Sequence, residues 1–364
     1  MSYLLKLAIE IINKVVKVET SIKAEKVVLP ACGSKHPYQH PKNFRVLSAA
    51  VQQGFDEWAA REVALPERKL YTFKDVYISW HGIIFKNLSL FVPSLMYPAL
   101  ADGFKNRFLF RQWIGDRQAL PLDRPLALVF DQWSAVNYFH WIIEAVPKLV
   151  VLARECPEAT LLLPGNLPDY VTATARIFGF HQFIPVREGV IYSAHSVLWP
   201  ERLGTFWLQD AGLLRKVRAV ILDFYKLTEV APHRKIYVSR ARAKIRRLVN
   251  EELLHEVLET NGFEVVFFEG MLFEEQVRLV AEAAVLVGVH GANLTNMLFM
   301  APATKLVELI NESNRNLAYY KLAACCSIDY YCLTCQNADA VVSNDSDFLV
   351  DVPAFTKLVA QGGA

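Results

Sequence analysis

Ala284-Val-Leu-Val-Gly-Val-His-Gly-Ala-Asn-Leu-Thr-Asn-Met-Leu-Phe299 is the most informative part of this chain. Its first apolar run ends abruptly at residues 290–293, and a second apolar pattern begins at Leu294. This order predicts a buried parallel strand, a tight loop and a helix N-terminus, where α/β sheets bind ligands such as phosphates. Gly291 would let a ligand approach the backbone closely. His290 adds a titratable donor, unless it is a core histidine bonded to the backbone.

Strand and helix patterns alternate around this stretch. The segment 234–240 predicts a strand that ends in Ser239 and Arg240, and Asn250 predicts the cap of the next helix. The remaining elements are a helix at 253–259, a strand at 263–268, a helix at 273–282 and strands at 285–289 and 305–310. This βαβαβ order is typical of a nucleotide-binding half-molecule with arginines along one edge.

Cationic residues follow the first of these strands. Arg240 stands at its carboxyl end, and Arg246 and Arg247 lie in the loop beyond, where their guanidinium groups could fork onto a diphosphate. The alternative is a solvated loop. We favour that interpretation only for Arg242 and Lys244.

Length and composition favour two α/β domains. At 364 residues, 53% of them hydrophobic, the chain is too long for one typical core. We expect an N-terminal domain at 1–225, a C-terminal domain at 226–345 and a C-terminal helix at 346–364 that could pack back on the N-terminal domain. The net charge of +2 argues against a nucleic-acid-binding surface, and no apolar run is long enough for a transmembrane helix.

The N-terminal half also reads as an α/β unit, with added β-strands near residues 73–93. A strand at 126–130 and a polar loop precede a helix that begins at Tyr138. His140 and Glu144 are four residues apart, so they share one face of that helix. A carboxylate among apolar neighbours suits a general base. A buried glutamate paired with a structural histidine or lysine is equally compatible with the spacing.

Apolar residues between Leu4 and Val16 are interleaved with charged ones. The charges argue against a cleaved signal peptide and predict an amphipathic helix. This helix either docks on the body of the protein or on another subunit, or lies on an anionic membrane surface. We favour docking, because the polar face is small.

Two short motifs suggest metal or redox chemistry, but a structural interpretation is favoured for both. Cys332 and Cys335 have a CxxC spacing, yet zinc needs four ligands and no second pair is nearby. We expect the six cysteines to be buried, reduced thiols of a cytosolic protein, with a redox role as the alternative. Asp345-Ser346-Asp347 is a D-x-D triplet, which capping aspartates in a loop explain better than a metal–nucleotide site.

Taken together, these motifs resemble glycosyltransferase family 61, a group that includes many bacterial capsular polysaccharide biosynthesis proteins. The similar segments follow the family's order between residues 125 and 310; they are 137–149, 236–240 with 246–252, 262–266 with 273–276, and 289–296. The resemblance implies an α/β, GT-B-like fold, in which two Rossmann-like domains face each other across a cleft. It also implies an inverting transferase that uses a nucleotide-sugar, with a UDP-sugar favoured.

The resemblance also assigns roles to residues of this chain. Glu144, with His140 beside it, would be the base that deprotonates the acceptor hydroxyl. The residues expected to bind the donor are Ser239, Arg240, Arg246, Arg247, His290, Gly291, Ala292, Asn293 and Asn296. Those expected to contact the acceptor are Asn137, Tyr138 and Trp141. No metal or other cofactor is implied, because cationic side chains and helix-end N–H groups would stabilise the leaving diphosphate.

Three positions depart from the family's pattern. Glu144 replaces the Asp of the His-Trp-x-x-Asp motif, and Lys148 replaces an Arg. Ala303 replaces a Gly, so a positive φ is disfavoured at that turn. These departures suggest a specialised branch of the family that uses an unusual sugar.

The expected partners are a nucleotide-sugar donor and a glycan or lipid-linked glycan acceptor of a capsule, exopolysaccharide or lipopolysaccharide. We expect a cytoplasmic protein. Three further properties are left open: peripheral contact with the inner face of the membrane, contact with a polysaccharide-assembly complex, and oligomer formation. One alternative function is a non-catalytic nucleotide-sugar-binding scaffold. Another is a different enzyme on a similar two-domain plan, such as a nucleotide-sugar epimerase.

Overall fold

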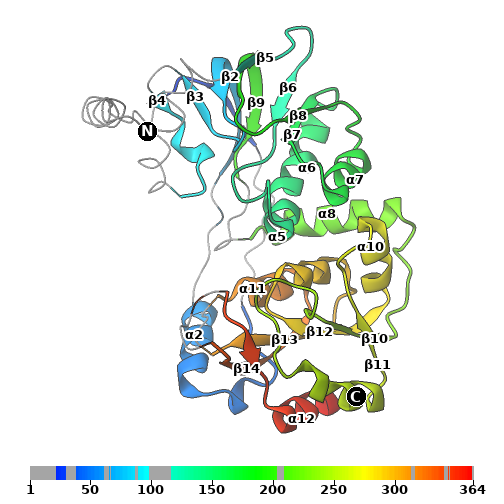
Figure 1. Cartoon of the computed structure of the whole chain (residues 1–364). Helices are drawn as coiled ribbons and strands as arrows, with labels where there is room; N and C mark the ends of the chain where they lie inside the picture. Colours follow the sequence, from blue (N-terminus) through cyan, green and yellow to red (C-terminus); the bar gives the residue numbers. More distant parts are fainter. Residues whose placement is uncertain are drawn as a thin grey trace, which may run out of the picture. The chain divides into compact units, whose positions relative to one another are not determined.

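The chain divides into two compact units, which are drawn in Figure 1. Unit 1 comprises residues 1–31 and 66–203, and unit 2 comprises residues 32–65 and 204–364. The computed structural model describes residues 22–29, 38–60, 65, 67–86, 89–97, 116–202, 209–312, 316–339, 343 and 345–362. The helix expected within the first 16 residues and Cys32 lie outside the described residues.

The boundary between the units differs from the one predicted between residues 225 and 226. Helix α8 (Ala211–Phe224) and helix α2 (Ala49–Ala59) both belong to unit 2. α8 contacts helix α11 (Ala318–Cys326) and the 3₁₀ helix η7 (Ala292–Phe299) of that unit. An amphipathic pattern predicts a helix but does not say which core its apolar face joins, and the structure corrects the boundary accordingly.

Unit 1 is built on one mixed sheet with the strand order β4-β3-β2-β9-β6-β7-β8, in which β1 also pairs with β2 and β5 with β9. β9, β6, β7 and β8 run parallel, whereas β1, β3 and β9 pair antiparallel with β2. The bounds are Glu25–Leu29 (β1), Arg68–Ile78 (β2), Ile84–Lys86 (β3), Ser89–Leu90 (β4), Arg117–Ala119 (β5), Leu126–Leu128 (β6), Thr160–Pro164 (β7), Phe183–Val186 (β8) and Ile191–Pro200 (β9). The antiparallel part matches the β-rich region expected near residues 73–93.

A long helical segment follows β6 in unit 1. It consists of α5 (Tyr138–His140), a π-helical turn η5 (Trp141–Ala145) and α6 (Val146–Glu155). α7 (Asp169–Ile177) follows β7 and packs on α6. β6 and β7 are buried along their whole length, as expected for parallel strands covered by helices.

Unit 2 contains a second sheet with the strand order β11-β10-β12-β13-β14-β15. The first five strands run parallel, and β15 pairs antiparallel with β14. The bounds are Arg234–Val238 (β10), Phe263–Val266 (β11), Ala283–Val289 (β12), Lys305–Asn311 (β13), Asp329–Asn337 (β14) and Phe348–Leu349 (β15). The chain leaves β10 for β11 on one side and returns to β12 on the other. The strand order therefore reverses between β10 and β12, and open α/β sheets bind ligands at the carboxyl ends of strands at such a switch point.

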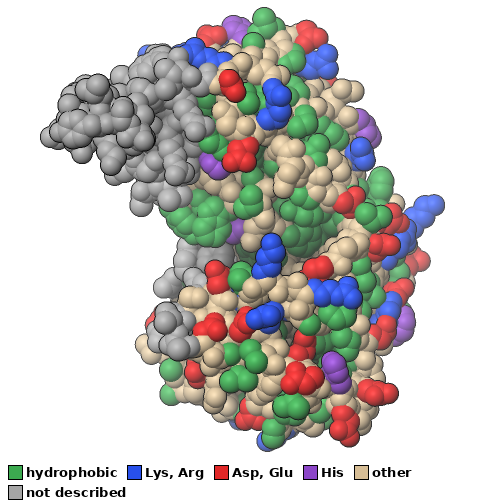
Figure 2. All heavy atoms as spheres, viewed as in Figure 1, with side chains coloured by type: hydrophobic (Ala, Val, Ile, Leu, Met, Phe, Trp, Pro, Cys, Tyr) green, Lys and Arg blue, Asp and Glu red, His purple; other side chains and the backbone are tan. Residues whose placement is uncertain are grey.

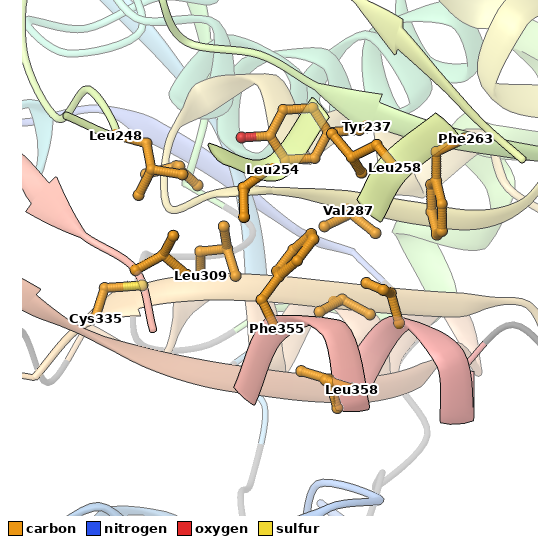
Figure 3. Close-up of a cluster of buried hydrophobic side chains, with 14 of the residues drawn as sticks. Tyr237, Leu248, Leu254, Leu258, Phe263, Val287, Leu309, Cys335, Phe355 and Leu358 are labelled. Carbon is orange, nitrogen blue, oxygen red and sulfur yellow. The ribbon is translucent and has the colours of Figure 1, made fainter. Parts of the chain in front are cut away.

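Helices cover both faces of the unit 2 sheet. η7, which contacts α8, α10 (Phe273–Ala281) and α11, lies on the face of Gly288, where an added Cβ would meet Leu294 at 3.0 Å. Figure 3 shows the apolar core on the opposite face, where Val287 points. The 3₁₀ helix η6 (Glu251–Leu254), α9 (His255–Thr260) and α12 (Val352–Gly362) contribute to this core. α12 thus packs on unit 2 through side chains such as Phe355, which corrects the suggestion that residues 346–364 pack back on the N-terminal domain.

The backbone confirms one local prediction and corrects another. The helix predicted after Gly291 is η7, a 3₁₀ helix; its residues 294–299 are all buried, so packing on several sides dominates its geometry. Ala303 takes a φ of 63° despite its side chain. Its N–H donates to the Ser327 carbonyl at 2.8 Å, which helps to hold that turn.

The surface carries charges of both signs. Figure 2 shows Lys and Arg side chains interspersed with Asp and Glu over the face in view, in keeping with a net charge of +2. In the part of the chain that the structure describes, none of the helices has the length and apolar character needed to span a membrane.

Candidate functional site

In unit 1, the loop after β6 places a buried acidic residue at the carboxyl end of a parallel strand. Asp131 is 3% exposed, and its Oδ1 accepts hydrogen bonds from the N–H groups of Trp133 at 3.1 Å and Ser134 at 3.0 Å. Its Oδ2 pairs with Nη2 of Arg202 at 2.7 Å. Burial alone would raise the pKa of Asp131, but the charges of Arg202 and Lys148 outweigh burial and hold the pKa well below its ordinary value. An ionised carboxylate therefore fixes this loop.

The helix after this loop is widened at the turn that carries the candidate base. Pro147 has no N–H to donate to the carbonyl of Ile143, and its ring would clash with that carbonyl in a regular α-helix. The turn Trp141–Ala145 takes a π-helical geometry, and the N–H of Val146 donates to the first carbonyl of the turn. Such turns occur frequently at functional sites, and this one carries Glu144.

Glu144 and His140 lie together, as their spacing predicts. Nδ1 of His140 is 3.2 Å from Oε2 of Glu144, and the two side chains are 4% and 0% exposed. Neither carboxylate oxygen of Glu144 accepts a hydrogen bond from a residue that the structure describes. Because a buried carboxylate without hydrogen bonds is costly, this geometry points to a ligand group that donates one.

Lys148 adds a positive charge next to these carboxylates. Its side chain is buried, and Nζ donates to the carbonyl of Val129 at 3.0 Å. Burial lowers the pKa of Lys148 to about 8, in spite of the attraction of Asp131 and Glu144. Below about pH 8 this lysine therefore favours the ionised form of Asp131.

The three residues predicted to contact the acceptor have different surroundings. Asn137 caps the start of α5 through its side chain. Trp141 is 0% exposed and its indole N–H donates to the hydroxyl of Thr174 at 2.9 Å, so this ring belongs to the core of unit 1. Tyr138 is half-buried and packs edge-on against Tyr170, with 5.0 Å between the ring centroids. Tyr138 alone of the three keeps a ring partly open to solvent.

Two aromatic residues that the sequence analysis did not single out lie near His140. Trp133 meets the His140 ring edge-on at 4.7 Å and is 39% exposed. Tyr97 packs against Trp133 at 5.8 Å, and burial together with the charge of Glu144 raises the pKa of Tyr97. Ligand sites typically combine such aromatic surfaces with a few polar groups. The sequence feature that could have indicated Trp133 is its position in a loop directly after a buried strand.

In unit 2, the switch point between β10 and β12 brings Arg240 and Gly291 into contact. A Cβ atom on Gly291 would lie 2.3 Å from Nη1 and 2.9 Å from Cζ of Arg240, so the guanidinium rests against the glycine backbone. Nε and Nη2 of Arg240 donate to the carbonyls of Arg246 at 3.2 Å and Ile245 at 3.0 Å. Gly291 is predicted to leave space beside the backbone for a ligand, whereas in the structure the guanidinium of Arg240 occupies that space.

Among the described residues, the loops that follow β10 and β12 hold a buried arginine without a carboxylate partner and two buried N–H groups without an acceptor. Arg240 is 8% exposed and has no ion pair with any carboxylate of the described residues. Burial and the charge of Arg246 lower the pKa of Arg240. Nε of Arg246 and Nδ2 of Asn293 are buried, and neither donates to another described residue. Buried cationic donors of this kind fit an anion, and the half-buried Ala292 stands beside them.

The segment 345–350 fixes the arginine loop. The N–H and Nη2 of Arg247 donate to the two carboxylate oxygens of Asp347 at 2.8 and 2.7 Å. The D-x-D triplet thus has a structural role in a loop, in line with the favoured interpretation. Asn250 exchanges two hydrogen bonds with the main chain of Val350 and makes no side-chain cap to η6, so the predicted cap was wrong because this pairing competes for its amide.

Because their surroundings differ, substitution of Arg246 and of Arg247 should affect binding of UDP, the nucleotide that the family resemblance implies, to different extents. Arg246→Ala should weaken the binding of UDP by about tenfold or more, since a hydrogen bond to a charged group contributes about 1.5–3 kcal/mol. Arg247→Ala should weaken it by at most about fivefold, because an exposed ion pair such as Arg247–Asp347 contributes only about 0.2–1 kcal/mol. Isothermal titration calorimetry on the two variants measures both values. Equal losses would contradict the assignment of Arg246 to the ligand and Arg247 to the loop.

Other residues predicted to bind the donor are engaged within unit 2. The Ser239 hydroxyl donates to Glu251 at 3.0 Å, and the Asn296 amide donates to Gln276 at 3.0 Å. Both side chains are almost fully buried, so they support the loops around the switch point. His290 pairs through Nδ1 with a buried carboxylate of β13, which excludes the alternative of a ring bonded only to backbone. The ligand contacts of all these residues stay predictions.

The cysteines that the structure describes are free and buried, as expected; they are Cys156, Cys325, Cys326, Cys332 and Cys335. Burial raises the pKa of the Cys335 thiol to about 12, which disfavours the reactive thiolate. Among the described residues, no three His, Cys, Asp or Glu side chains gather in a way that could hold a metal ion.

Comparison with known proteins identifies similar sequences for the part of the chain that carries Glu144, Arg240 and Gly291. Residues 138–307 match the family model described as Glycosyltransferase 61. An EGF domain-specific O-linked N-acetylglucosamine transferase of Drosophila melanogaster is 32% identical over 142 residues, which are 37% of this chain and 26% of that protein. The beta-1,2-xylosyltransferase RCN11 of Oryza sativa subsp. japonica is 28% identical over 110 residues, which are 27% of this chain and 20% of that protein. The matches therefore span only 26% and 20% of the length of these two relatives.

Proposed function

We propose that this chain, whose residues 138–307 match the Glycosyltransferase 61 family model, transfers a sugar from a nucleotide-sugar to a hydroxyl group of a glycan. One complementary observation supports this function most directly. Among the described residues, Nε of Arg246 and Nδ2 of Asn293 in unit 2 are buried without an acceptor, and the buried carboxylate of Glu144 in unit 1 accepts no hydrogen bond. A diphosphate matches the first set and an acceptor hydroxyl matches the second.

On the donor side, we assign the diphosphate of a UDP-sugar to Arg240, Arg246 and the loop after β12. Arg240 is held against Gly291 at the switch point of a parallel sheet, where α/β folds commonly bind nucleotides. Two guanidinium groups would neutralise the charge that develops on the leaving diphosphate. The proposed reaction therefore needs no metal ion.

On the acceptor side, we assign the base to Glu144. Its carboxylate is buried, lacks hydrogen bonds from described residues and lies 3.2 Å from His140. Trp133 offers an exposed aromatic surface for a sugar ring next to this pair. Binding of the donor by unit 2 and of the acceptor by unit 1 is the division of labour of a GT-B enzyme.

The proposed chemistry is a single displacement with inversion. The acceptor hydroxyl gives its proton to Glu144 while its oxygen forms a bond to the anomeric carbon. The bond between that carbon and the phosphate oxygen breaks, and the nucleoside diphosphate leaves with the electron pair. Because attack and departure occur on opposite faces of the carbon, the anomeric configuration inverts.

The proposed acceptor is a growing capsular, extracellular or lipopolysaccharide glycan. The two relatives are named for the transfer of N-acetylglucosamine and xylose, so UDP-N-acetylglucosamine and UDP-xylose are the first donors to test. A cytoplasmic location, with contact to the inner face of the membrane, belongs to the same proposal.

Nucleotide binding by the purified chain tests this function. Calorimetry with UDP, GDP and CMP, each with magnesium and then with EDTA, should show metal-independent binding of one diphosphate nucleotide, UDP being favoured. Arg240→Ala should greatly weaken that binding. Binding only with magnesium would contradict metal independence, and no binding of any nucleotide would contradict the donor site.

Product analysis then separates a transferase from the two alternatives. Sugar transfer to a defined glycan by the purified chain excludes the non-catalytic scaffold. Conversion of the donor without any acceptor would instead indicate an epimerase.

A further inference from the structure

Glu308 is a fully buried carboxylate at the centre of the unit 2 sheet, on β13. Its Oε1 accepts a hydrogen bond from Nδ1 of His290, which directly follows β12. Its Oε2 accepts a hydrogen bond from the hydroxyl of Tyr330 on β14 at 2.6 Å. Side chains from β13, β14 and the end of β12 thus form one buried hydrogen-bond network.

This hydrogen-bond network determines which nitrogen of His290 is available to a ligand. Because the carboxylate engages Nδ1, Nε2 remains for a ligand. The carboxylate also fixes the orientation of the ring. His290 precedes Gly291, against which Arg240 rests, so the ring belongs to the loop with the unpartnered donors.

A buried carboxylate usually lowers the stability of the fold compared with an apolar side chain, so its presence in a sheet core suggests a functional role. We propose that Glu308 is a positioning residue of the donor site, which acts through His290 by holding its ring so that Nε2 is presented to the nucleotide. This inference rests on the proposed function and adds His290 to the contacts of Arg240 and Arg246. The other titratable or charged groups around the pair are Tyr319, Tyr330, Cys332, Arg240 and Arg246.

The test measures the affinity of the full chain for UDP by calorimetry. Glu308→Gln should weaken binding by roughly tenfold or more, because the uncharged amide is a weaker acceptor for Nδ1 of His290 and holds the ring less firmly. His290→Gln should weaken binding to a similar extent.

Coupling between the two residues distinguishes positioning from a merely structural role. If Glu308 acts through His290, Glu308→Gln should cost little additional affinity in a His290→Gln background. Tyr330→Phe is a matched control, because it removes a buried hydrogen bond to the same carboxylate but leaves the His290 contact. This variant should lower the thermal stability while the affinity for UDP is kept.

Several results would overturn the inference. One is a Glu308→Gln variant that binds UDP with the wild-type affinity. If Glu308→Gln does not fold, wild-type affinity in His290→Gln has the same meaning. Both results leave the proposed transferase intact, whereas a wild-type chain that binds no nucleotide would overturn the function and the inference together.

Discussion

Glu144→Gln is expected to lower kcat for sugar transfer by about 10²- to 10⁴-fold, the usual contribution of a general base, without a change in UDP affinity. The amide keeps the size of the side chain but cannot take the acceptor proton. Glu144 suits the role because its carboxylate is fully buried in the widened turn η5, 3.2 Å from Nδ1 of His140 and without a hydrogen bond from described residues.

The measurement is a steady-state transfer assay, with calorimetry of UDP binding on the same preparation. Glu155→Gln is the matched control, because it makes the same change at an exposed position at the end of α6 and should leave kcat unchanged. Near wild-type turnover in Glu144→Gln would show that another group accepts the proton. A loss of UDP affinity as large as the loss of kcat would show that the variant is misfolded.

Gly291→Ala is expected to weaken UDP binding by roughly 10- to 150-fold, the effect of losing a hydrogen bond to a charged group worth about 1.5–3 kcal/mol. The new methyl group would lie 2.3 Å from Nη1 of Arg240, so the guanidinium must move. Moving it breaks its hydrogen bonds to the carbonyls of Ile245 and Arg246. The substitution thus tests the position of Arg240 while leaving its charge in the protein.

Calorimetry of Gly291→Ala, Arg240→Ala and the double variant measures the coupling between the two sites. If the methyl group acts by displacing Arg240, the two losses should not add. Gly54→Ala in α2 is the control in the same unit, since an added Cβ there meets nothing closer than Cδ1 of Leu317 at 4.0 Å. Additive losses would mean that Gly291 serves the ligand directly and that Arg240 acts elsewhere.

Local sequence patterns predicted the elements of the fold and part of each site. The apolar run before His290 is strand β12, and the segment that follows Gly262 is strand β11. The four-residue spacing of His140 and Glu144 placed the two side chains together. These predictions succeed because helix and strand periodicity, turn residues and short-range spacing act within a few residues of the chain.

The sequence alone thus determined the α/β class, the order of strands and helices in unit 2 and the loops that carry the candidate residues. The folded chain determined which of those loops meet. Arg240 rests on Gly291 because β10 and β12 are neighbours, and Glu308 joins His290 to Tyr330, 18 and 22 residues away, because β12, β13 and β14 are adjacent. The choice of neighbouring strands and of the core that an amphipathic helix joins depends on long-range packing, which no local pattern encodes.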